Sequence, residues 1–430
     1  MKHRFDSHTC PELEIVKPGE HLAYPVRQHI GKDAEIVVSV GERVSCGQVL
    51  AKGNASFVSA NVHASVSGIV SDIKPVMTAD GKTVKSIIVK NDGRYNQVLQ
   101  LRSNQTQRNY NRMSPQEIID AVYNAGIVGM GGAGFPTHIK LSKDRENIRN
   151  VIINGAECEP YVSADHRLML SEADRLICGI QILLKLFCNA SAVIVIEDNK
   201  PDAAKLISEK IRAYNNISVK VIKSGYPKGA ERLLVHAVTK KRLAMGKLPK
   251  EAGCIVCNVA TVTEICRAVA DAQPLIKRIV TVTGGALAKP HNYLVSLGTD
   301  IGTVIQAAGV KKENIAKIIA GGPMMGKAVY SYDVPVTKTT SAIICMDERE
   351  AYMAPESVCI RCGKCGDVCP EKLVPQILAE YACRYEWDSF RRAGGMNCCE
   401  CGSCTYICPA KRSLTQMFAG AKKVIKSKEA

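Results

Sequence analysis

The strongest constraint on this 430-residue chain is one spacing of cysteines that occurs twice near its C-terminal end. Both copies read Cys-x2-Cys-x2-Cys-x3-Cys-Pro; the first is Cys359, Cys362, Cys365 and Cys369, and the second is Cys398, Cys401, Cys404 and Cys408. In this iron–sulfur pattern, three closely spaced thiolates of one copy hold a [4Fe–4S] cluster together with the fourth thiolate of the other copy. We therefore expect two clusters, on a first quartet (Cys359, Cys362, Cys365 and Cys408) and a second quartet (Cys398, Cys401, Cys404 and Cys369).

Two zinc knuckles are the main alternative for these cysteines. Zinc knuckles use Cys-x2-Cys pairs separated by a spacer, and three cysteines at consecutive x2 spacings match that arrangement poorly. Cys399 is out of register with the repeat, so we do not expect it to be a ligand. Two clusters in series would carry single electrons and could not accept a hydride. A chain of this kind therefore needs a further redox group if its electrons arrive in pairs.

The charge of the chain limits its partners. Lys and Arg number 57 against 41 Asp and Glu, which gives a formal net charge of +16. Such a charge favours acidic partners, for example an anionic membrane surface or an acidic electron carrier. Nucleic acid is not expected, because the basic residues are scattered and no recognition module is visible. No apolar run reaches the roughly 20 residues that cross a bilayer, and the first residues lack a secretory signal, so we expect a cytosolic or peripheral protein.

A glycine-rich loop marks the middle of the chain. Residues 126–140 read GIVGMGGAGFPTHIK, in which Gly129, Gly131 and Gly134 fit the weak pattern GxGxxG. A dinucleotide fingerprint should follow a strand, whereas the preceding segment is predicted to be a helix with Ser114 as its N-cap. We therefore expect the loop to bring its backbone close to a flat or phosphorylated ligand in another way.

Strands and helices alternate after this loop. A strand from Asn150 ends in Asn154, Glu157 and Glu159, and the carboxyl end of a parallel strand is where α/β sheets place ligands. A capped loop before a helix near Ala164 explains the same polar residues equally well. The alternation of strand and helix over residues 191–222 predicts a doubly wound parallel sheet.

Three segments carry a specific resemblance: GMGGAGFPTHIK (129–140), INGAECEPY (153–161) and YPKGAERLL (226–234). They are similar to the flavin domain of the RnfC family, the peripheral subunit of the Rnf ferredoxin–NAD oxidoreductase complex. That domain is similar in turn to the NADH-oxidising flavoprotein subunit of respiratory complex I. The resemblance covers about residues 12–425. It implies FMN cradled by the glycine loop, with NAD(H) stacked on it.

The resemblance also implies roles for individual residues. Those expected at the FMN phosphate are Gly129, Gly131 and Lys140. Those expected around the flavin are Asn154, Glu157, Glu231 and Asn258. Those expected at the nicotinamide, where the chemistry occurs, are Phe135 and Glu159. Two positions depart from the complex I pattern, because Ala230 replaces one of its paired glutamates and Met130 replaces an arginine.

Two further segments resemble smaller domains. Residues 278–330 are similar to the β-grasp-like (SLBB) domain that follows the flavin domain, and we expect it to pack between the flavin and the clusters. Residues 37–70 have the alternation of a lipoyl- or biotinyl-type half barrel. No lysine occurs within residues 53–68, so a carrier function is excluded and a structural barrel-sandwich is expected. RnfC-like chains begin with this module, whereas the related cobalamin reductases place it after the flavin domain.

These interpretations predict a multidomain α/β protein. Its expected parts are a barrel-sandwich domain (1–105), an FMN- and NAD-binding α/β domain (112–250), an SLBB domain (251–345) and a two-cluster ferredoxin-like helical module (350–430). The resemblance implies an oxidoreductase and translocase subunit, bound peripherally at the cytoplasmic side of the membrane. Its partners would be the other Rnf membrane subunits, NAD(H) and, indirectly, ferredoxin. Alternatives are a soluble flavin and iron–sulfur reductase partner, of the cobalamin-reductase or amino-acid-reductase kind, and a non-redox binding protein with structural clusters.

Overall fold

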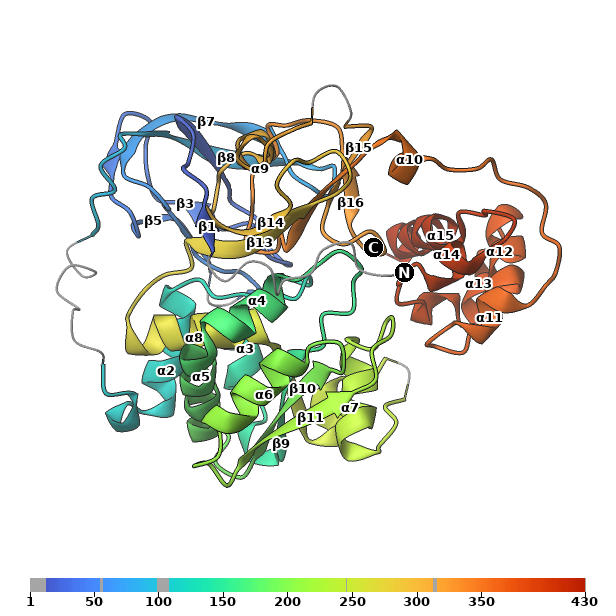
Figure 1. Cartoon of the computed structure of the whole chain (residues 1–430), viewed down its shortest axis with the longest axis horizontal. Coiled ribbons are helices and arrows are strands. Elements are labelled where there is room, and N and C mark those ends of the chain that lie inside the picture. Colours follow the sequence, from blue (N-terminus) through green and yellow to red (C-terminus); the bar gives the residue numbers. More distant parts are fainter. Residues whose placement is uncertain (1–12, 55–56, 99–107, 245, 312–314, 430) are drawn as a thin grey trace.

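The computed structural model describes residues 13–54, 57–98, 108–244, 246–311 and 315–429 (Figure 1). They form a β-rich N-terminal part, a parallel α/β domain, a mixed β-sheet and a helical module. In Figure 1 the two β-rich parts lie above the α/β domain, and the helical module lies to one side. The predicted multidomain α/β fold is confirmed.

The N-terminal part is a barrel-sandwich of two small antiparallel sheets. One sheet has the order β2 (His21–Pro25), β8 (Thr83–Asn91), β7 (Gly68–Met77) and β4 (Arg43–Val44), and the other has the order β3 (Glu35–Ile36), β5 (Val49–Lys52) and β6 (Val62–His63). Leu22, Tyr24 and Leu50 are fully buried in the core that the two sheets share. Since successive side chains of a strand point to opposite faces, the alternation in residues 37–70 reflects this core.

Four parallel strands in the order β11–β10–β9–β12 form the sheet of the α/β domain. The strands are β9 (Asn150–Gly155), β10 (Ser191–Glu197), β11 (Ile217–Ile222) and β12 (Cys254–Asn258). The helices are α2 (Pro115–Asn124), α3 (Thr137–Ser142), α4 (Ala164–Ser171), α5 (Ala173–Leu186), α6 (Pro201–Lys210), α7 (Glu231–Thr239) and α8 (Val259–Ala270), with short 3-10 helices η2 (Tyr110–Arg112), η3 (Arg145–Asn147) and η4 (Pro249–Ala252). Leu234 and Val235 of α7 pack with Ile152 and Val195 in one cluster, while α5 and α8 share another with Val151. Helices therefore cover both faces, and the predicted doubly wound sheet is confirmed.

Two of the predicted domain boundaries differ from the structure. The predicted limit at residue 250 is wrong, because β12 pairs with β9 and α8 packs on α5, so the α/β domain extends to Ala270. The predicted N-terminal domain also loses its first strand, β1 (Glu14–Ile15), which pairs in parallel with β14 of the mixed sheet. In both cases a short strand pairs with a strand far away in the sequence, β12 with β9 and β1 with β14, and its local composition does not identify that partner.

The mixed sheet has the order β1–β14–β13–β17–β15–β16. Its remaining elements are β13 (Lys277–Thr283), β14 (His291–Ser296), α9 (Ile301–Ala308), β15 (Lys317–Ala320), β16 (Lys327–Val329), β17 (Ala342–Met346) and the short helix α10 (Glu348–Ala351). The turn at residues 321–326 joins β15 to β16. This turn, the 321–326 loop, contacts Glu159 of the α/β domain.

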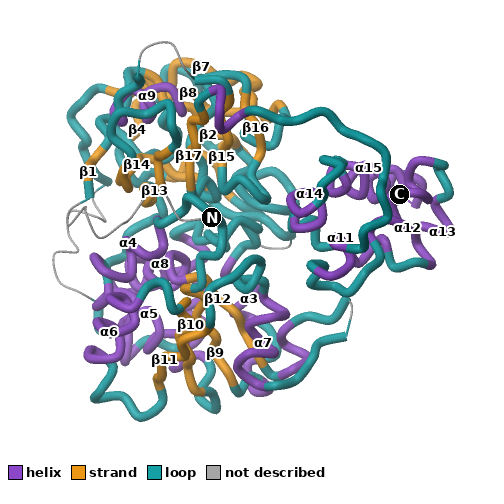
Figure 2. The backbone as a smooth tube through the Cα atoms, turned by 45° about the vertical axis from the view of Figure 1, so that its right-hand side comes forward, coloured by secondary structure: helices purple, strands orange, loops and turns teal. Residues whose placement is uncertain are grey.

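The helical module follows a long segment without helix or strand, residues 352–363, that runs around the outer edge of the module (Figures 1 and 2). Its helices are α11 (Lys364–Asp367), α12 (Pro375–Cys383), α13 (Trp387–Arg392), η5 (Gly395–Asn397), α14 (Ser403–Ile407) and α15 (Leu414–Glu429). Leu378, Phe390 and Phe418 form a small core, in which the two phenylalanine rings lie 6.1 Å apart. None of the described helices is long and apolar enough to span a bilayer.

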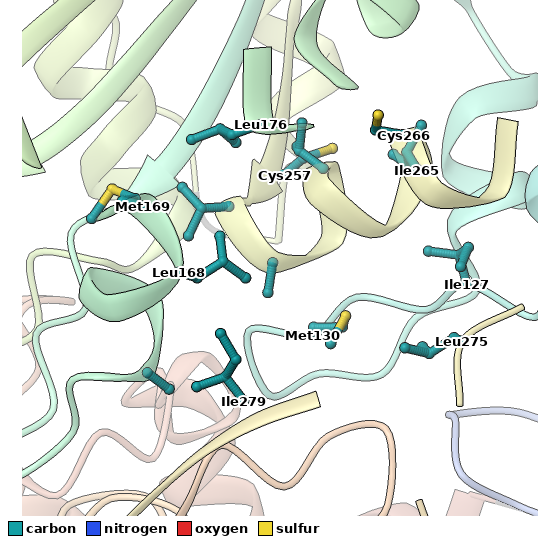
Figure 3. Close-up of a cluster of buried hydrophobic side chains, with 14 of the residues drawn as sticks. Ile127, Met130, Leu168, Met169, Leu176, Cys257, Ile265, Cys266, Leu275 and Ile279 are labelled. Carbon is teal, nitrogen blue, oxygen red and sulfur yellow. The ribbon is translucent and has the colours of Figure 1, made fainter. Parts of the chain in front are cut away.

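One large hydrophobic core joins the α/β domain to the mixed sheet. Figure 3 shows part of it, where Met130 of the glycine loop lies among Leu168, Leu275 and Ile279. Leu168 belongs to α4 and Ile279 to β13, so the core crosses from one domain to the other. The glycine loop is therefore anchored at the junction of the two domains.

Two helical glycines allow a matched test of this core. A Cβ at Gly179 of α5 would lie 2.1 Å from the backbone oxygen of Val262 in α8, whereas a Cβ at Gly420 of α15 would meet no atom within 4 Å. Gly179→Ala should destabilise the protein by about 1–3 kcal/mol, because the backbone of α8 must move. Gly420→Ala should stabilise it by up to ~1 kcal/mol, the difference in helix propensity. Thermal unfolding of both variants measures the two signs, and a stabilising Gly179→Ala would contradict the packing of α5 on α8.

Candidate functional site

Two asparagines lie opposite each other at the carboxyl edge of the parallel sheet. Asn154 of β9 and Asn258 of β12 are register partners. Asn258 caps α8 by accepting a hydrogen bond from the N–H of Ala260 (2.9 Å), and its amide donates to Asp165 (2.6 Å). The Asn154 amide donates to the carbonyl of Gly229 (3.0 Å). The structure thus brings together these two predicted flavin-site residues at the edge where open α/β sheets bind ligands.

The glycine loop closes as a narrow hairpin beside this edge. The N–H of Gly129 donates to the carbonyl of Phe135 (2.8 Å), and the N–H of Gly134 donates to the carbonyl of Gly129 (3.0 Å). The tip at Gly131 is exposed, and a Cβ there would lie only 3.3 Å from the Cβ of Asn258. The loop follows helix α2, whose predicted N-cap Ser114 completes a capping box. The backbone at Gly131 is therefore open to a ligand that approaches Asn258.

Lys140 and Glu231, the next predicted pair, meet at the same edge. The Lys140 ammonium, on α3, donates to the Glu231 carboxylate at the start of α7 (2.9 Å) and to the carbonyl of Val256 in β12 (2.5 Å). Both side chains are partly exposed. The edge therefore presents a cation that a phosphate could pair with.

Glu157 has a structural role that supports the capped-loop interpretation. It has a positive φ of 38°, and its carboxyl accepts hydrogen bonds from the N–H groups of Asp165 (2.7 Å) and His166 (3.0 Å) in the first turn of α4. Burial, reinforced by the neighbouring Asp165 carboxyl, raises the pKa of Glu157 to about 8. Asp165 in turn accepts a hydrogen bond from Asn258, so Glu157 helps to fix the position of Asn258 at the carboxyl edge of the sheet.

Glu159 joins the α/β domain to the 321–326 loop. Its two carboxylate oxygens accept hydrogen bonds from the N–H groups of Met324 and Met325, both at 3.0 Å. Gly322 of the same loop lies so close that a Cβ there would be 2.2 Å from the carboxylate. Burial raises the pKa of Glu159, although the two N–H groups act in the opposite direction. The residue expected at the nicotinamide is thus held by the backbone of another domain.

The base of the glycine loop is fixed by a buried lysine that the sequence did not reveal as important. The Lys338 ammonium, fully buried, donates to the carbonyls of Asn61 and Gly126, the latter at 2.7 Å. Asn61 lies in the 53–68 segment, and its amide donates to the carbonyl of Tyr123 at the end of α2 (3.3 Å). Burial lowers the pKa of Lys338 to about 7. The 53–68 segment of the barrel-sandwich, which in a carrier domain would present the modified lysine, therefore packs against the base of the glycine loop.

The eight cysteines gather around two cavities in the helical module. One cavity is lined by the first quartet, Cys359, Cys362, Cys365 and Cys408, and the other by the second quartet, Cys369, Cys398, Cys401 and Cys404. Cys399 also borders the second cavity. Within the described residues, no three His, Cys, Asp or Glu side chains lie close enough together to hold a single metal ion.

The two cysteine motifs have the same backbone. The residue before each second cysteine has a positive φ (Arg361 54°, Glu400 56°), as does the glycine after it (Gly363 78°, Gly402 81°). The N–H of Arg361 points at the sulfur of Cys359, and that of Glu400 at the sulfur of Cys398, both at 3.4 Å. Donors aimed at sulfur stabilise a thiolate, so both loops suit anionic iron–sulfur ligands.

The second cavity faces the α/β domain. The Tyr226 hydroxyl donates to the carbonyl of Cys401 (2.6 Å), and a Cβ at Gly402 would lie 2.8 Å from the carbonyl oxygen of Met324. An ion pair between Arg232 and Glu371 (2.9 Å) adds a third contact. The 321–326 loop therefore lies between Glu159 and the second quartet. Tyr226 is the first residue of the YPKGAERLL motif, but the resemblance implied no role for it.

Comparisons with known proteins agree with the domain organisation of the chain. Three family models match the chain: the Nuo51 FMN-binding domain over residues 122–267, the RnfC barrel sandwich hybrid domain over 2–94, and the SLBB domain over 279–328. The chain is 40% identical over 370 residues, 85% of its length, to a subunit of the proton-translocating ferredoxin:NAD(+) oxidoreductase complex of Clostridium ljungdahlii, of which it covers 79%. It is 39% identical over 414 residues to the corresponding subunit of the Na(+)-translocating ferredoxin:NAD(+) oxidoreductase complex of Acetobacterium woodii, covering 96% of the chain and 93% of the relative.

A solved structure shares the fold. The chain matches the NAD+-reducing [NiFe]-hydrogenase in the H2-reduced state with a TM-score of 0.50 and 16% identity. The match covers 73% of this chain and 61% of the hydrogenase chain.

Proposed function

Because the chain belongs to the RnfC family, we propose that it is the electron-transfer subunit of a ferredoxin:NAD⁺ oxidoreductase complex. Its relatives in Clostridium ljungdahlii and Acetobacterium woodii are named as subunits of ion-translocating complexes of this kind. In this function the chain exchanges electrons with NAD(H) at the edge of the parallel sheet and with partner proteins at the helical module. Ion translocation belongs to those partner proteins.

The observation that carries the proposal is the contact between the sheet edge and the second quartet. Glu159 holds the 321–326 loop, and the same loop packs on Gly402 between Cys401 and Cys404. A cofactor bound at the edge and a cluster bound by the second quartet would thus be neighbours in one chain. Cys359 and Cys362 of the first quartet are exposed, which suits a path that leads outwards.

The residues at the sheet edge fit FMN. Lys140 offers a cation for the phosphate, Gly131 offers open backbone, and Asn154 and Asn258 offer amides from neighbouring strands. When bound, FMN can take up two electrons as a hydride and release them singly, as one-electron clusters require. Glu157 keeps the N-terminus of α4 and Asp165 in place beneath this edge, so we assign it a positioning role there. Phe135 remains our candidate for the nicotinamide side, whereas we assign Glu159, whose two carboxylate oxygens accept hydrogen bonds from Met324 and Met325, to holding the 321–326 loop.

The location of the protein at the membrane follows from its proposed partners. The relatives are members of ion-translocating complexes, which work across a membrane. We propose peripheral attachment on the cytoplasmic side, where NAD(H) and ferredoxin are found. A basic chain of net charge +16 suits contact with acidic partner surfaces there.

Anaerobic reconstitution tests this function. We expect about eight irons and eight sulfides per chain, from two four-iron clusters, together with one FMN. NADH should bleach the flavin and then reduce the clusters, which absorbance and electron paramagnetic resonance can follow in one titration. Protein that bound zinc in place of iron, or that took up clusters and flavin without reacting with NADH, would contradict the proposal.

A further inference from the structure

Two cysteines of the first quartet belong to a continuous stretch of exposed chain, residues 355–364. All ten residues of the 355–364 segment are exposed, including the ligands Cys359 and Cys362. The segment has no helix or strand before α11, and it is fastened to the module by the N–H of Ser357, which donates to the carbonyl of Ala410 (3.0 Å), and by Glu356, which accepts from the N–H of Ser413 (2.9 Å). The second quartet differs, because Cys401 is only 8% exposed and its loop packs on Met324.

Two apolar side chains flank the first ligand of this segment. Val358 is 86% exposed and Ile360 is 64% exposed, on either side of Cys359. Neither belongs to the core of the module. Exposed apolar side chains occur elsewhere on this chain, but among the described residues Cys359 is the only cluster ligand that has one on each side, where a partner could bury them.

Basic side chains surround these apolar residues. Arg361 and Lys364 are exposed in the same segment, and Arg361 and Arg412 line the first cavity. Within the part of the chain that the structure describes, no ion pair involves any of these three cations. Glu356, the one carboxylate within residues 355–364, accepts hydrogen bonds from Ser413, which together with the charge of Arg412 lower its pKa. The surface around Cys359 therefore attracts negative charge.

Resting on the proposed function, we propose that the 355–364 segment, with Arg412, is the docking surface for an acidic protein that carries its own iron–sulfur centre. One electron passes between the cluster held by the first quartet and the centre of the carrier, so one is oxidised as the other is reduced and no atom moves. Short-lived redox complexes of this kind need only a small interface, so a ten-residue patch is sufficient. A lipid surface would also meet basic and apolar groups, but it would not require two exposed cluster ligands at the centre of the patch.

Charge reversal on this surface tests the proposal. Arg361→Glu combined with Lys364→Glu changes neither a cysteine ligand nor a residue of the sheet edge. Stopped-flow mixing of dithionite-reduced holoprotein with an oxidised acidic two-[4Fe–4S] ferredoxin measures the second-order rate of electron transfer. At low salt we expect the double variant to be at least about tenfold slower than the wild type, because steering is lost, and the two rates to converge at high salt. Val358→Ser with Ile360→Ser should slow transfer at every salt concentration.

A matched control reverses two other exposed lysines of the same module, Lys423→Glu with Lys426→Glu in α15. This variant should transfer electrons within about twofold of the wild-type rate. Equal rates for the two charge-reversed variants would overturn the proposal. So would a segment variant that lost binding to phosphatidylglycerol vesicles while its rate with ferredoxin stayed normal. Dithionite reduces the clusters without NADH, so a failure of docking is distinguishable from a failure of the proposed function.

Discussion

Replacing Cys369 with serine should remove the cluster of the second quartet, although Cys369 belongs by sequence to the first motif. The structure places Cys369 on the cavity of Cys398, Cys401 and Cys404. Iron should fall from about eight to about four per chain, because one four-iron cluster is lost. The second quartet is the one that contacts the α/β domain, so NADH should no longer reduce the remaining cluster at a normal rate. Iron analysis and electron paramagnetic resonance after NADH addition measure both effects.

The reciprocal variant Cys408→Ser is the control. It should also lose about four irons, but NADH should still reduce the cluster that remains, because the second quartet is intact. Cys399→Ser should keep both clusters, since Cys399 borders the second cavity without belonging to the repeat. If Cys369→Ser and Cys408→Ser behaved alike towards NADH, the order of the two clusters relative to the sheet edge would be wrong.

The grouping of the cysteines was predictable because their spacing is local information. Three residues separated by x2 turns can wrap one object, and the chain after the fourth cysteine turns away at Pro370 or Pro409. The structure gathers the same two sets of four that the spacing predicts. It also shows matching positive φ values at Arg361 and Glu400, which could not be predicted because neither arginine nor glutamate favours the left-handed region.

The predicted end of the α/β domain at residue 250 was wrong because the pairing of a strand with a distant strand cannot be deduced from its local sequence. Residues 254–258 form a short apolar run that suits any buried strand. Its pairing with β9, about 100 residues earlier, places Asn258 opposite Asn154 at the carboxyl edge of the parallel sheet. The resemblance implied a flavin contact for Asn258, and the pairing with β9 is what places this residue beside Asn154, the other asparagine named by the resemblance.

The role of Glu159 could not be predicted for a related reason. Its partners are backbone N–H groups of Met324 and Met325, which every non-proline residue offers, at a separation of about 165 residues. The one signal in the sequence is Gly322, where a side chain would collide with the carboxylate. A glycine-rich turn is common, however, and its partner becomes evident only in the folded chain.

Glu159→Ala should distinguish the role that the structure indicates for Glu159, which is to hold the 321–326 loop, from the nicotinamide role that the resemblance implies. Removing the carboxylate leaves the N–H groups of Met324 and Met325 without this acceptor. The N–H of Met325 is exposed and can bond water, whereas that of Met324 is partly buried and should cost about 1–3 kcal/mol when unsatisfied. The loop should then shift, and its contact with Gly402 beside the second quartet should be lost. We expect transfer from NADH-reduced flavin to the clusters to slow by at least about tenfold, because the loop no longer holds the sheet edge and the second quartet at a fixed separation. Flavin bleaching by NADH should change by no more than about twofold, because among the residues that the structure describes Glu159 shares no hydrogen-bond partner with Lys140 or the two asparagines of the sheet edge. Stopped-flow spectra resolve the two steps.

Glu157→Gln is the matched control, because it changes a carboxyl two residues earlier on the same segment. It weakens the hydrogen bonds to the first turn of α4 and leaves the 321–326 loop in place. It should therefore lower FMN retention or thermal stability, while transfer from flavin to clusters stays normal in the flavin-loaded protein. A rise in the KM for NADH in Glu159→Ala, with normal reduction of the clusters, would instead show that Glu159 acts on the nicotinamide and that its contact with Met324 and Met325 is incidental.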